Sequence, residues 1–212
     1  MAPRILVMAK APEPGAVKTR LRLPSEDAAR LQEAMISDAA EKASYVAPAA
    51  VAASPAEKLE SVRRLVPRDT PLLAQPEGDL GQRMLAGARE LFRQGDGPVL
   101  VVGTDSPTLP ASYLRDSLRS LDAGSDVALT PSEDGGYVAI GLRKPYAALF
   151  EGMAWSTPRV HLQTIEAARR AGLTVHETGL WYDVDEPDDL ERLRAELARD
   201  PALAPRTARL LG

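Results

Sequence analysis

Short apolar runs without polar alternation are the feature that most restricts how this chain can fold. The two clearest cover residues 5–9 and 99–103, and each leads into a segment rich in glycine, proline and polar residues. A run of this length is typical of a strand buried on both faces, as in a parallel sheet. Weaker runs predict further strands over residues 126–130, 173–177 and 46–53.

Segments with helical patterns separate these runs. We expect helices over residues 25–43, 57–66, 80–94, 111–121, 158–171 and 187–199. Ser25 suits an N-cap, and Gly172 suits the end of a helix. Pro158 and Pro187 suit first-turn positions. Strands that alternate with helices imply βαβ units, so the chain predicts an α/β fold with a mainly parallel central sheet flanked by helices.

Length and composition point to one domain over residues 1–212. A chain of 212 residues can bury a sizeable core, and no internal repeat, low-complexity tract or linker divides it. Aromatic residues make up only 4%, so aliphatic side chains must fill that core. The tail after Pro201 is expected only to pack on the outside.

Charge and residue usage exclude several classes of function. The net charge of −4 gives no sign of the basic surface that a nucleic acid polymer requires. The absence of cysteine removes disulfides and thiolate sites, and two histidines cannot supply a multi-histidine zinc site. No stretch approaches the roughly 20 apolar residues of a membrane span. We therefore expect a cytoplasmic protein, and a homodimer stays open.

The loop after the first run carries the features of a phosphate site. It contains Gly15 within a stiff, proline-rich turn, together with the cations Lys10, Lys18 and Arg20. Polyphosphates bind where a loop places backbone amides and cations together. The spacing differs from a P-loop and from the dinucleotide fingerprint, because Val17 precedes Lys18. The alternative is an ordinary solvated basic loop.

Acidic residues follow the other strands, where an open α/β sheet binds its ligands. Thr104 and Asp105 come directly after the run over 99–103, and magnesium and manganese prefer such oxygen ligands. The alternative for Asp105 is a turn into the next helix. Asp183 lies too far upstream to cap the helix from Pro187, so it is the better candidate for a second metal ligand. Asp185 fits capping and metal binding equally.

The segment around Glu133, Asp134, Gly135 and Gly136 combines acids with flexible backbone. Its two glycines allow the chain to approach a ligand closely. The same residues are typical of a tight hairpin, with residues 137–140 as the returning strand. Both interpretations can hold, since a turn can present an acid.

Two further positions could contact a ligand. In the segment 75–84, Gly78 would let a base or ribose lie close, and Arg83 could reach a phosphate. The alternative is a capped helix start with Asp79 as the N-cap. Trp155 either lines an acceptor pocket or simply packs.

Together these segments resemble a bacterial family of glycosyltransferase-like proteins with the GT-A fold, also known as the domain of unknown function DUF2064. The matching stretches run in the family's order over nearly the whole chain: 10–21, 78–84, 103–107, 133–137, 155–157 and 183–190. Ser106 stands where the family usually has another small residue, and Glu186 stands where threonine is frequent. Neither of these two positions is one of the residues proposed to bind the metal.

The resemblance implies a Rossmann-like nucleotide-diphospho-sugar transferase domain. On that basis we expect Asp105, with Asp183 or Asp185, to hold Mg or Mn that bridges a diphosphate. Lys18 and Arg20 would bind phosphate oxygens, and residues 78–83 would lie near the base or ribose. The turn over 133–136 would face the sugar or acceptor, with its aspartate as the base that activates an acceptor hydroxyl.

Three functions remain open at this point. The first is a glycosyltransferase that moves a sugar from a nucleotide-sugar to a small acceptor. The second is a nucleotidyltransferase that uses an NTP and releases pyrophosphate. The wider superfamily contains such enzymes, including the guanylyltransferase of phospholactate, and the cations near Lys18 suit a triphosphate. The third is a non-catalytic protein that binds a nucleotide tightly without turnover.

Overall fold

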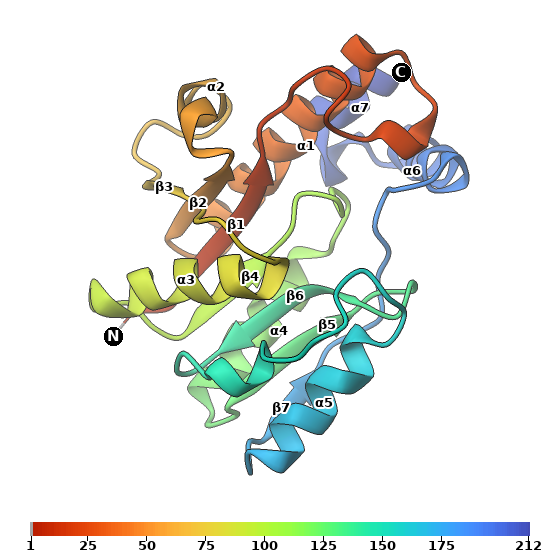
Figure 1. The fold of residues 1–212 in the computed structure, drawn as a ribbon. Helices are drawn as coiled ribbons and strands as arrows, with labels where there is room; N and C mark the ends of the chain where they lie inside the picture. The colour runs from red at the N-terminus through yellow and green to blue at the C-terminus, as the bar shows by residue number, and fades with distance from the viewer. Residues whose placement is uncertain (1) are drawn as a thin grey trace.

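The computed structural model describes residues 2–212 and contains one seven-stranded sheet. Its strands are β1 (Arg4–Lys10), β2 (Ala49–Ser54), β3 (Leu72–Ala74), β4 (Val99–Val102), β5 (Val127–Pro131), β6 (Tyr137–Leu142) and β7 (Val175–Glu177). They lie side by side in the order β3-β2-β1-β4-β6-β5-β7. Only β6 runs antiparallel to its neighbours β4 and β5. The predicted α/β fold with a mainly parallel sheet is confirmed (Figure 1).

Helices connect the strands. The α-helices are α1 (Ser25–Val46), α2 (Leu59–Arg63), α3 (Leu80–Arg93), α4 (Ala111–Asp122), α5 (Val160–Arg170), α6 (Pro187–Arg199) and α7 (Pro205–Leu211). Four 3-10 turns lie between them: η1 (Thr19–Leu21), η2 (Ala56–Lys58), η3 (Ala147–Leu149) and η4 (Pro201–Leu203). Strand β3 was not expected. It is short and half-buried, so it lacks the apolar run that revealed the other strands.

Successive residues of the buried strands face opposite helical layers, as the two-residue period of a strand requires. Ile5 and Val7 pack into a cluster with side chains of α1, α2 and α4. Leu6 points the other way, into a cluster with α3 and α5. Figure 1 shows α3 and α5 on the near side of the sheet and α4 behind it. A third cluster joins α1, α6 and α7.

The predicted helix starts are partly correct. Asp79 is the N-cap of α3 in a capping box, as expected, and Pro187 is the first residue of α6. Ser25 is not an N-cap but the first residue of α1, and Pro24 precedes it in the cap position. Helix α5 begins at Val160, so Pro158 lies before the helix and not in its first turn.

Helix ends differ in similar ways. Gly172 has φ 68° just after α5, as expected for the end of a helix. The helix predicted over residues 57–66 is shorter, because only Leu59–Arg63 is α-helical and η2 precedes it. The starts differ by at most two residues, by which helix boundaries ordinarily shift. The ends of α1 and α2 differ by three residues from the expected positions 43 and 66.

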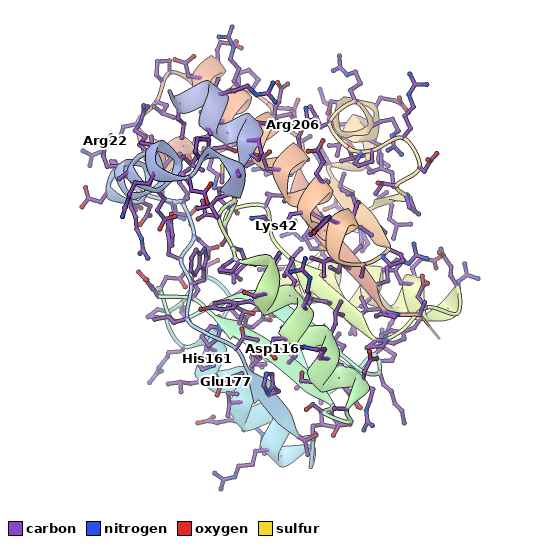
Figure 2. All side chains as sticks on the ribbon, turned by 180° about the vertical axis from the view of Figure 1, so that it is seen from behind. Arg22, Lys42, Asp116, His161, Glu177 and Arg206 are labelled. Atoms are coloured by element: carbon purple, nitrogen blue, oxygen red, sulfur yellow. The ribbon has the colours of Figure 1, made fainter. Side chains whose placement is uncertain are left out.

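The C-terminal tail is more than an outer covering. Asp38 of α1 accepts hydrogen bonds from the backbone nitrogens of Arg206 and Thr207 and from the Thr207 hydroxyl. Thr207 is fully buried. The prediction of a merely external tail was therefore wrong. Figure 2 shows Arg206 on α7 beside α1.

A lysine ties α1 to the loop after β4. Lys42 Nζ donates to the carbonyls of Pro107 at 2.5 Å and Leu109 at 2.9 Å (Figure 2). The loop that carries Asp105 is thereby fixed to α1. Within residues 2–212, no helix combines the length and apolar character that crossing a membrane requires.

Candidate active site

Loops from four strands meet at the carboxyl edge of the sheet. After β7, the segment 178–184 crosses over this edge instead of turning away. The backbone nitrogens of Thr178 and Trp181 donate to the carbonyls of Leu129 and Pro131, and Val184 N donates to Asp105 O at 2.8 Å. Residues almost eighty positions apart are thereby brought together. This is the edge where open α/β sheets bind ligands.

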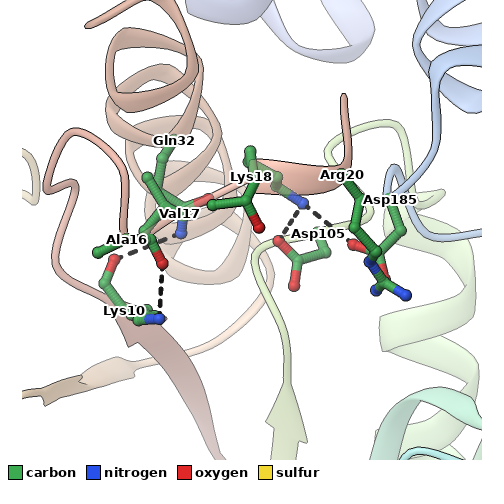
Figure 3. A pocket seen from close by; sticks show the side chains of 9 residues that line it. Lys10, Ala16, Val17, Lys18, Arg20, Gln32, Asp105 and Asp185 are labelled. Carbon is green, nitrogen blue, oxygen red and sulfur yellow. Dashed lines mark hydrogen bonds and ion pairs between the residues drawn. The ribbon is translucent and has the colours of Figure 1, made fainter. Parts of the chain in front are cut away.

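Lys18 lies at the centre of this edge. Its Nζ is 2.5 Å from Asp105 Oδ1 and 3.6 Å from Asp185 Oδ1, and it donates to the Val184 carbonyl at 2.7 Å (Figure 3). Its side chain is only 5% exposed. The backbone at Lys18 has φ 50°, which is uncommon outside glycine and tends to occur at functional positions. The loop therefore aims this ammonium inward at two carboxylates.

Arg20 extends the same cluster toward solvent. Its Nη2 is 2.6 Å from Asp185 Oδ2, and its Nε is 3.7 Å from a Glu186 carboxylate oxygen. Lys18 and Arg20 were expected to bind phosphate, and here both pair with carboxylates. Asp185 therefore uses its side chain in ion pairs, while Glu186 is the N-cap of α6. The capping role considered for Asp185 is wrong.

A small pocket lies beside this cluster, with a volume of about 190 Å³. We call it the basic pocket; it is lined by Lys10, Ala16, Val17, Lys18, Thr19, Arg20, Gln32, Asp105 and Asp185. Gly15, with φ 78°, forms the turn that precedes it, and Lys10 Nζ donates to the Ala16 carbonyl. Thr104 is buried and faces inward, where its hydroxyl accepts from the Gln32 amide at 3.3 Å. Thr104 thus supports the pocket from behind.

Asp183 is held by two hydroxyls. Ser106 Oγ donates to its Oδ1 at 2.5 Å, and Ser132 Oγ donates to its Oδ2 at 3.2 Å. Burial raises the pKa of the Asp183 carboxyl to about 6, although the Ser106 hydrogen bond opposes this. Repulsion from Asp105 and other nearby carboxylates adds to the rise. A cation here would relieve this excess of negative charge.

The donor chemistry fits a divalent cation. Asp105, Asp183 and Asp185 offer the oxygen ligands that magnesium and manganese prefer. Within residues 2–212, no three or more histidine and carboxylate side chains already converge into a metal cage. The Lys18 ammonium instead bridges Asp105 and Asp185, so a positive charge already stands between two of the expected ligands.

A larger cavity of about 630 Å³ adjoins the basic pocket, and the two share Arg20, Asp105 and Asp185. We call it the acidic cavity. Besides those three residues it is lined by Leu80, Ser132, Glu133, Asp134, Gly136, Tyr137, Trp155, Ser156, Thr157, Pro158, Val160, Tyr182, Asp183, Glu186 and Asp189. The structure thus brings the expected acceptor-facing residues next to the expected metal ligands.

The turn between β5 and β6 both closes a hairpin and presents acids. Asp134 Oδ1 accepts from Gly136 N at 2.9 Å. Gly135 has φ 87°, and a Cβ there would lie 2.3 Å from the Pro158 carbonyl oxygen. Only glycine fits at that point. The turn and the acid-presenting interpretations therefore both hold, since Asp134 also lines the cavity.

Glu133 is held by a residue that the sequence analysis missed. Arg192 Nη1 lies 2.8 Å from Glu133 Oε2, and the guanidinium sits 3.7 Å from the centre of the Tyr182 ring. Arg192 is one of several exposed arginines on α6, and nothing in its local sequence marks it. Only the tertiary contact with the turn identifies it.

The start of α3 plays a supporting part. Gly78, Asp79 and Arg83 line neither of the two cavities. Arg83 donates to the Gln75 side chain at 3.3 Å and weakly to the Asp79 carbonyl. The adjoining Gly81 leaves room for the Trp155 ring, which a Cβ there would meet at 2.3 Å. The capped helix start is confirmed, and contact with a base or ribose stays a prediction.

The chain matches one protein family over more than half of its length. Residues 35–157 match the family described as uncharacterized proteins conserved in bacteria, DUF2064. The chain belongs to this family. The phosphoenolpyruvate guanylyltransferase of Sphaerobacter thermophilus is 34% identical over 125 residues, which is 57% of this chain and 58% of that protein. The alignment thus spans little more than half of this curated relative.

Solved structures show the same fold. A protein from Desulfovibrio desulfuricans G20, assigned provisionally as a nucleotide-diphospho-sugar transferase, superposes with a TM-score of 0.87 at 31% identity, covering 100% of this chain and 97% of that one. The CMP:2-keto-3-deoxy-manno-octonic acid synthetase complexed with CTP gives 0.62 at 13% identity, covering 94% and 100%. The second similarity concerns the fold alone. The expected family and fold are confirmed, and they group the chain with transferases.

Proposed function

We propose that this DUF2064 member is a metal-dependent transferase that uses a nucleotide-diphosphate donor and moves a sugar to a small acceptor. The observation that carries this proposal is the border between the two cavities. There, Lys18 and Arg20 from the loop after β1 meet Asp105 and Asp185 from the loops after β4 and β7. A diphosphate needs the cations, and its metal needs the carboxylates.

The residues of this border, and Asp183 and Asp134 in the adjoining cavity, each have a role in the proposal. Asp105, Asp183 and Asp185 would hold Mg or Mn, which supplies charge neutralisation for the leaving diphosphate when bound. Lys18 and Arg20 would exchange their carboxylate partners for phosphate oxygens. Asp134 lines the adjoining cavity with one oxygen bonded to Gly136 N, so its other oxygen could accept a proton from an acceptor hydroxyl.

Glycosyl transfer is placed first because the relative at 31% identity over the whole chain is assigned provisionally as a nucleotide-diphospho-sugar transferase. The cations near Lys18 do not decide between a diphosphate and a triphosphate, because either one would have to displace the carboxylates that pair with them.

Nucleotidyl transfer is the second candidate. It is supported by the guanylyltransferase relative, whose aligned part includes more than half of this chain. In that case the donor would be an NTP and the released group would be pyrophosphate. A protein that binds a nucleotide tightly without turnover could have the same residues at the border, but it would form neither product.

The test is a thermal-shift panel of NTPs, NDPs and nucleotide-sugars, each with and without Mg or Mn. A ligand that binds the native state raises the melting temperature by mass action. We expect a metal-dependent shift with one nucleotide-sugar, followed by release of a nucleoside diphosphate when acceptors are added. A shift with one NTP and release of pyrophosphate would establish the second candidate instead. No shift with any nucleotide would refute the proposal.

A further inference from the structure

The acidic cavity has an unusual balance of charged side chains. One guanidinium, that of Arg20, lines it together with seven carboxylates. The carboxylates belong to Asp105, Glu133, Asp134, Asp183, Asp185, Glu186 and Asp189. In the proposed function this cavity receives the acceptor, because it adjoins the border where the donor's diphosphate would lie.

Several of these charges are balanced within the protein. Glu133 pairs with Arg192, and Asp185 pairs with Lys18 and Arg20. Asp189 accepts hydrogen bonds from two backbone nitrogens at the start of α6. These groups can therefore remain ionised without further cations.

Asp134 and Asp183 are different. Asp134 bonds only to the Gly136 amide, and Asp183 bonds only to two serine hydroxyls. Among residues 2–212, neither has a lysine or arginine within ion-pair distance. A divalent ion at the border would balance Asp183 together with Asp105, but the Asp134 charge would persist. In the proposed function Arg20 is engaged by the donor's phosphate, and the described lining holds no further lysine or arginine that could bind an anionic acceptor.

The remaining wall suits an uncharged molecule. Trp155 and Tyr137 give aromatic surface, and Ser132, Ser156 and Thr157 give hydroxyls. The Trp155 ring is stacked on Phe150 with centroids 6.5 Å apart, which fixes its orientation. Aromatic surface with a few placed polar groups is typical of small-molecule sites, and carboxylates accept hydrogen bonds from hydroxyl or ammonium groups.

We propose that the acceptor is a hydroxyl-bearing molecule that is neutral or cationic and carries neither phosphate nor carboxylate. This inference rests on the proposed function, since it concerns the second substrate of the same site. Asp134 is exposed, so water weakens the repulsion, but an anionic group beside it would still meet a like charge that no lysine or arginine offsets. This chain would therefore reject phosphoenolpyruvate, the acceptor named for its guanylyltransferase relative.

The first test does not require the acceptor to be known. Nitroxide probes that differ only in charge, 4-amino-TEMPO and 4-carboxy-TEMPO, are added to the Mg-saturated protein. Paramagnetic relaxation is then measured at the amides of Gly136, Ser156 and Thr157. We expect at least threefold more relaxation from the cationic probe, and less of this excess in Asp134→Asn. Asp188→Asn, which removes an exposed carboxylate outside the cavity, should leave the ratio unchanged. Equal or reversed relaxation would overturn the proposal.

The second test measures transfer with the donor that the thermal-shift panel identifies. Sugars, polyols and amino sugars are offered beside their monophosphates, together with phosphoenolpyruvate, and product release is followed. We expect kcat/KM at least tenfold higher for the unphosphorylated member of each active pair. A phosphorylated member that is equal or better, or turnover of phosphoenolpyruvate, would overturn the proposal. Failure to bind any nucleotide would instead refute the transferase function. The ratio of relaxation from the cationic and anionic probes would still test the charge preference of the cavity.

Discussion

The basic pocket and the acidic cavity lie at the same edge of the sheet but balance their charges in opposite ways. In the basic pocket, Lys18 and Arg20 each contact a carboxylate within 2.6 Å. In the acidic cavity, Asp134 and Asp183 contact only amide and hydroxyl donors. One side is neutralised by ion pairs, and the other keeps an excess of negative charge.

This difference indicates where ligand binding would exchange the most ion-pair partners. Arg20, Asp105 and Asp185 line both cavities, so they form the border between them. If a metal took the carboxylates while a diphosphate took the cations, both sets would exchange partners without leaving a charge unpaired. The ion pairs of the free protein would then hold the site in shape until its ligands arrive.

Removal of Asp105 should break the border most severely. Asp105→Asn keeps the size of the side chain but removes the charge that both Lys18 and a metal would contact. The Asp105 side chain is 46% exposed, so loss of its charged contacts costs about 1.5–3 kcal/mol, the range for hydrogen bonds to charged groups. We therefore expect nucleotide affinity in the presence of Mg to fall by roughly 10- to 150-fold. Titration calorimetry with the donor measures it.

The control for this prediction is Asp188→Asn, at an exposed position in the first turn of α6. It removes the same charge from the same side of the molecule without touching either cavity. Nucleotide affinity should be unchanged. Equal losses in the two variants would mean that net charge alone, and not the border, governs binding.

Substitution of Lys18 should have opposite effects on diphosphate binding and on metal binding. Lys18→Met removes a charged donor, a loss of about 1.5–3 kcal/mol, so binding of diphosphates should fall roughly 10-fold or more while binding of nucleosides barely changes. Without nucleotide, Mg or Mn should bind more tightly, because the ammonium no longer competes for Asp105 and Asp185. The exposed Lys144→Met serves as the control. Weaker metal binding in Lys18→Met would show that Lys18 does not compete with the cation.

Loss of Arg192 should have a smaller effect, confined to the acidic cavity. Arg192→Met frees Glu133 from its ion pair and removes the stacking on Tyr182. Exposed pairs contribute about 0.2–1 kcal/mol, so the acceptor KM should rise only about two- to fivefold, with little change in kcat or in donor affinity. Steady-state kinetics would show this, with Arg199→Met on the same helix as the control. A fall in donor affinity would contradict the separation of the two cavities.

The parts of the fold that could be predicted are those with a local cause. The buried runs over β1, β4 and β5 and the capping box at Asp79 depend on residues close together in the chain. Strand β3 could not be predicted, because its three residues, two half-buried and one exposed, form no buried apolar run and pair with the sheet only through β2. The helix starts expected at Ser25 and Pro158 were misplaced by one and two residues.

The site shows the same division between local and distant causes. The strand ends located Lys18, Asp105 and Asp183 without any structure, because parallel strands place their carboxyl ends together. The pairing of Lys18 with Asp105 and Asp185 was not predictable, since the segment after β7 had to cross the sheet edge to bring Asp185 to Lys18. Arg192 was missed because its partner lies 59 residues away.

Lys42 provides a test outside both cavities, since it is a largely buried cation that contacts neither of them. Burial lowers the pKa of Lys42 to about 8 from 10.5, with Asp38 opposing the shift. Between these values the unfolded chain binds the extra proton, so this group makes the free energy of unfolding rise as pH increases from about 8 to about 10.5. The stability difference between the native protein and Lys42→Met should therefore shift toward the native protein by on the order of 1–2 kcal/mol over that range. Urea unfolding at pH 7.5 and 10 measures it, and tyrosines that titrate in both proteins cancel. A constant difference would mean that Lys42 keeps its ordinary pKa and that its bonds to the Pro107 and Leu109 carbonyls fully offset its burial.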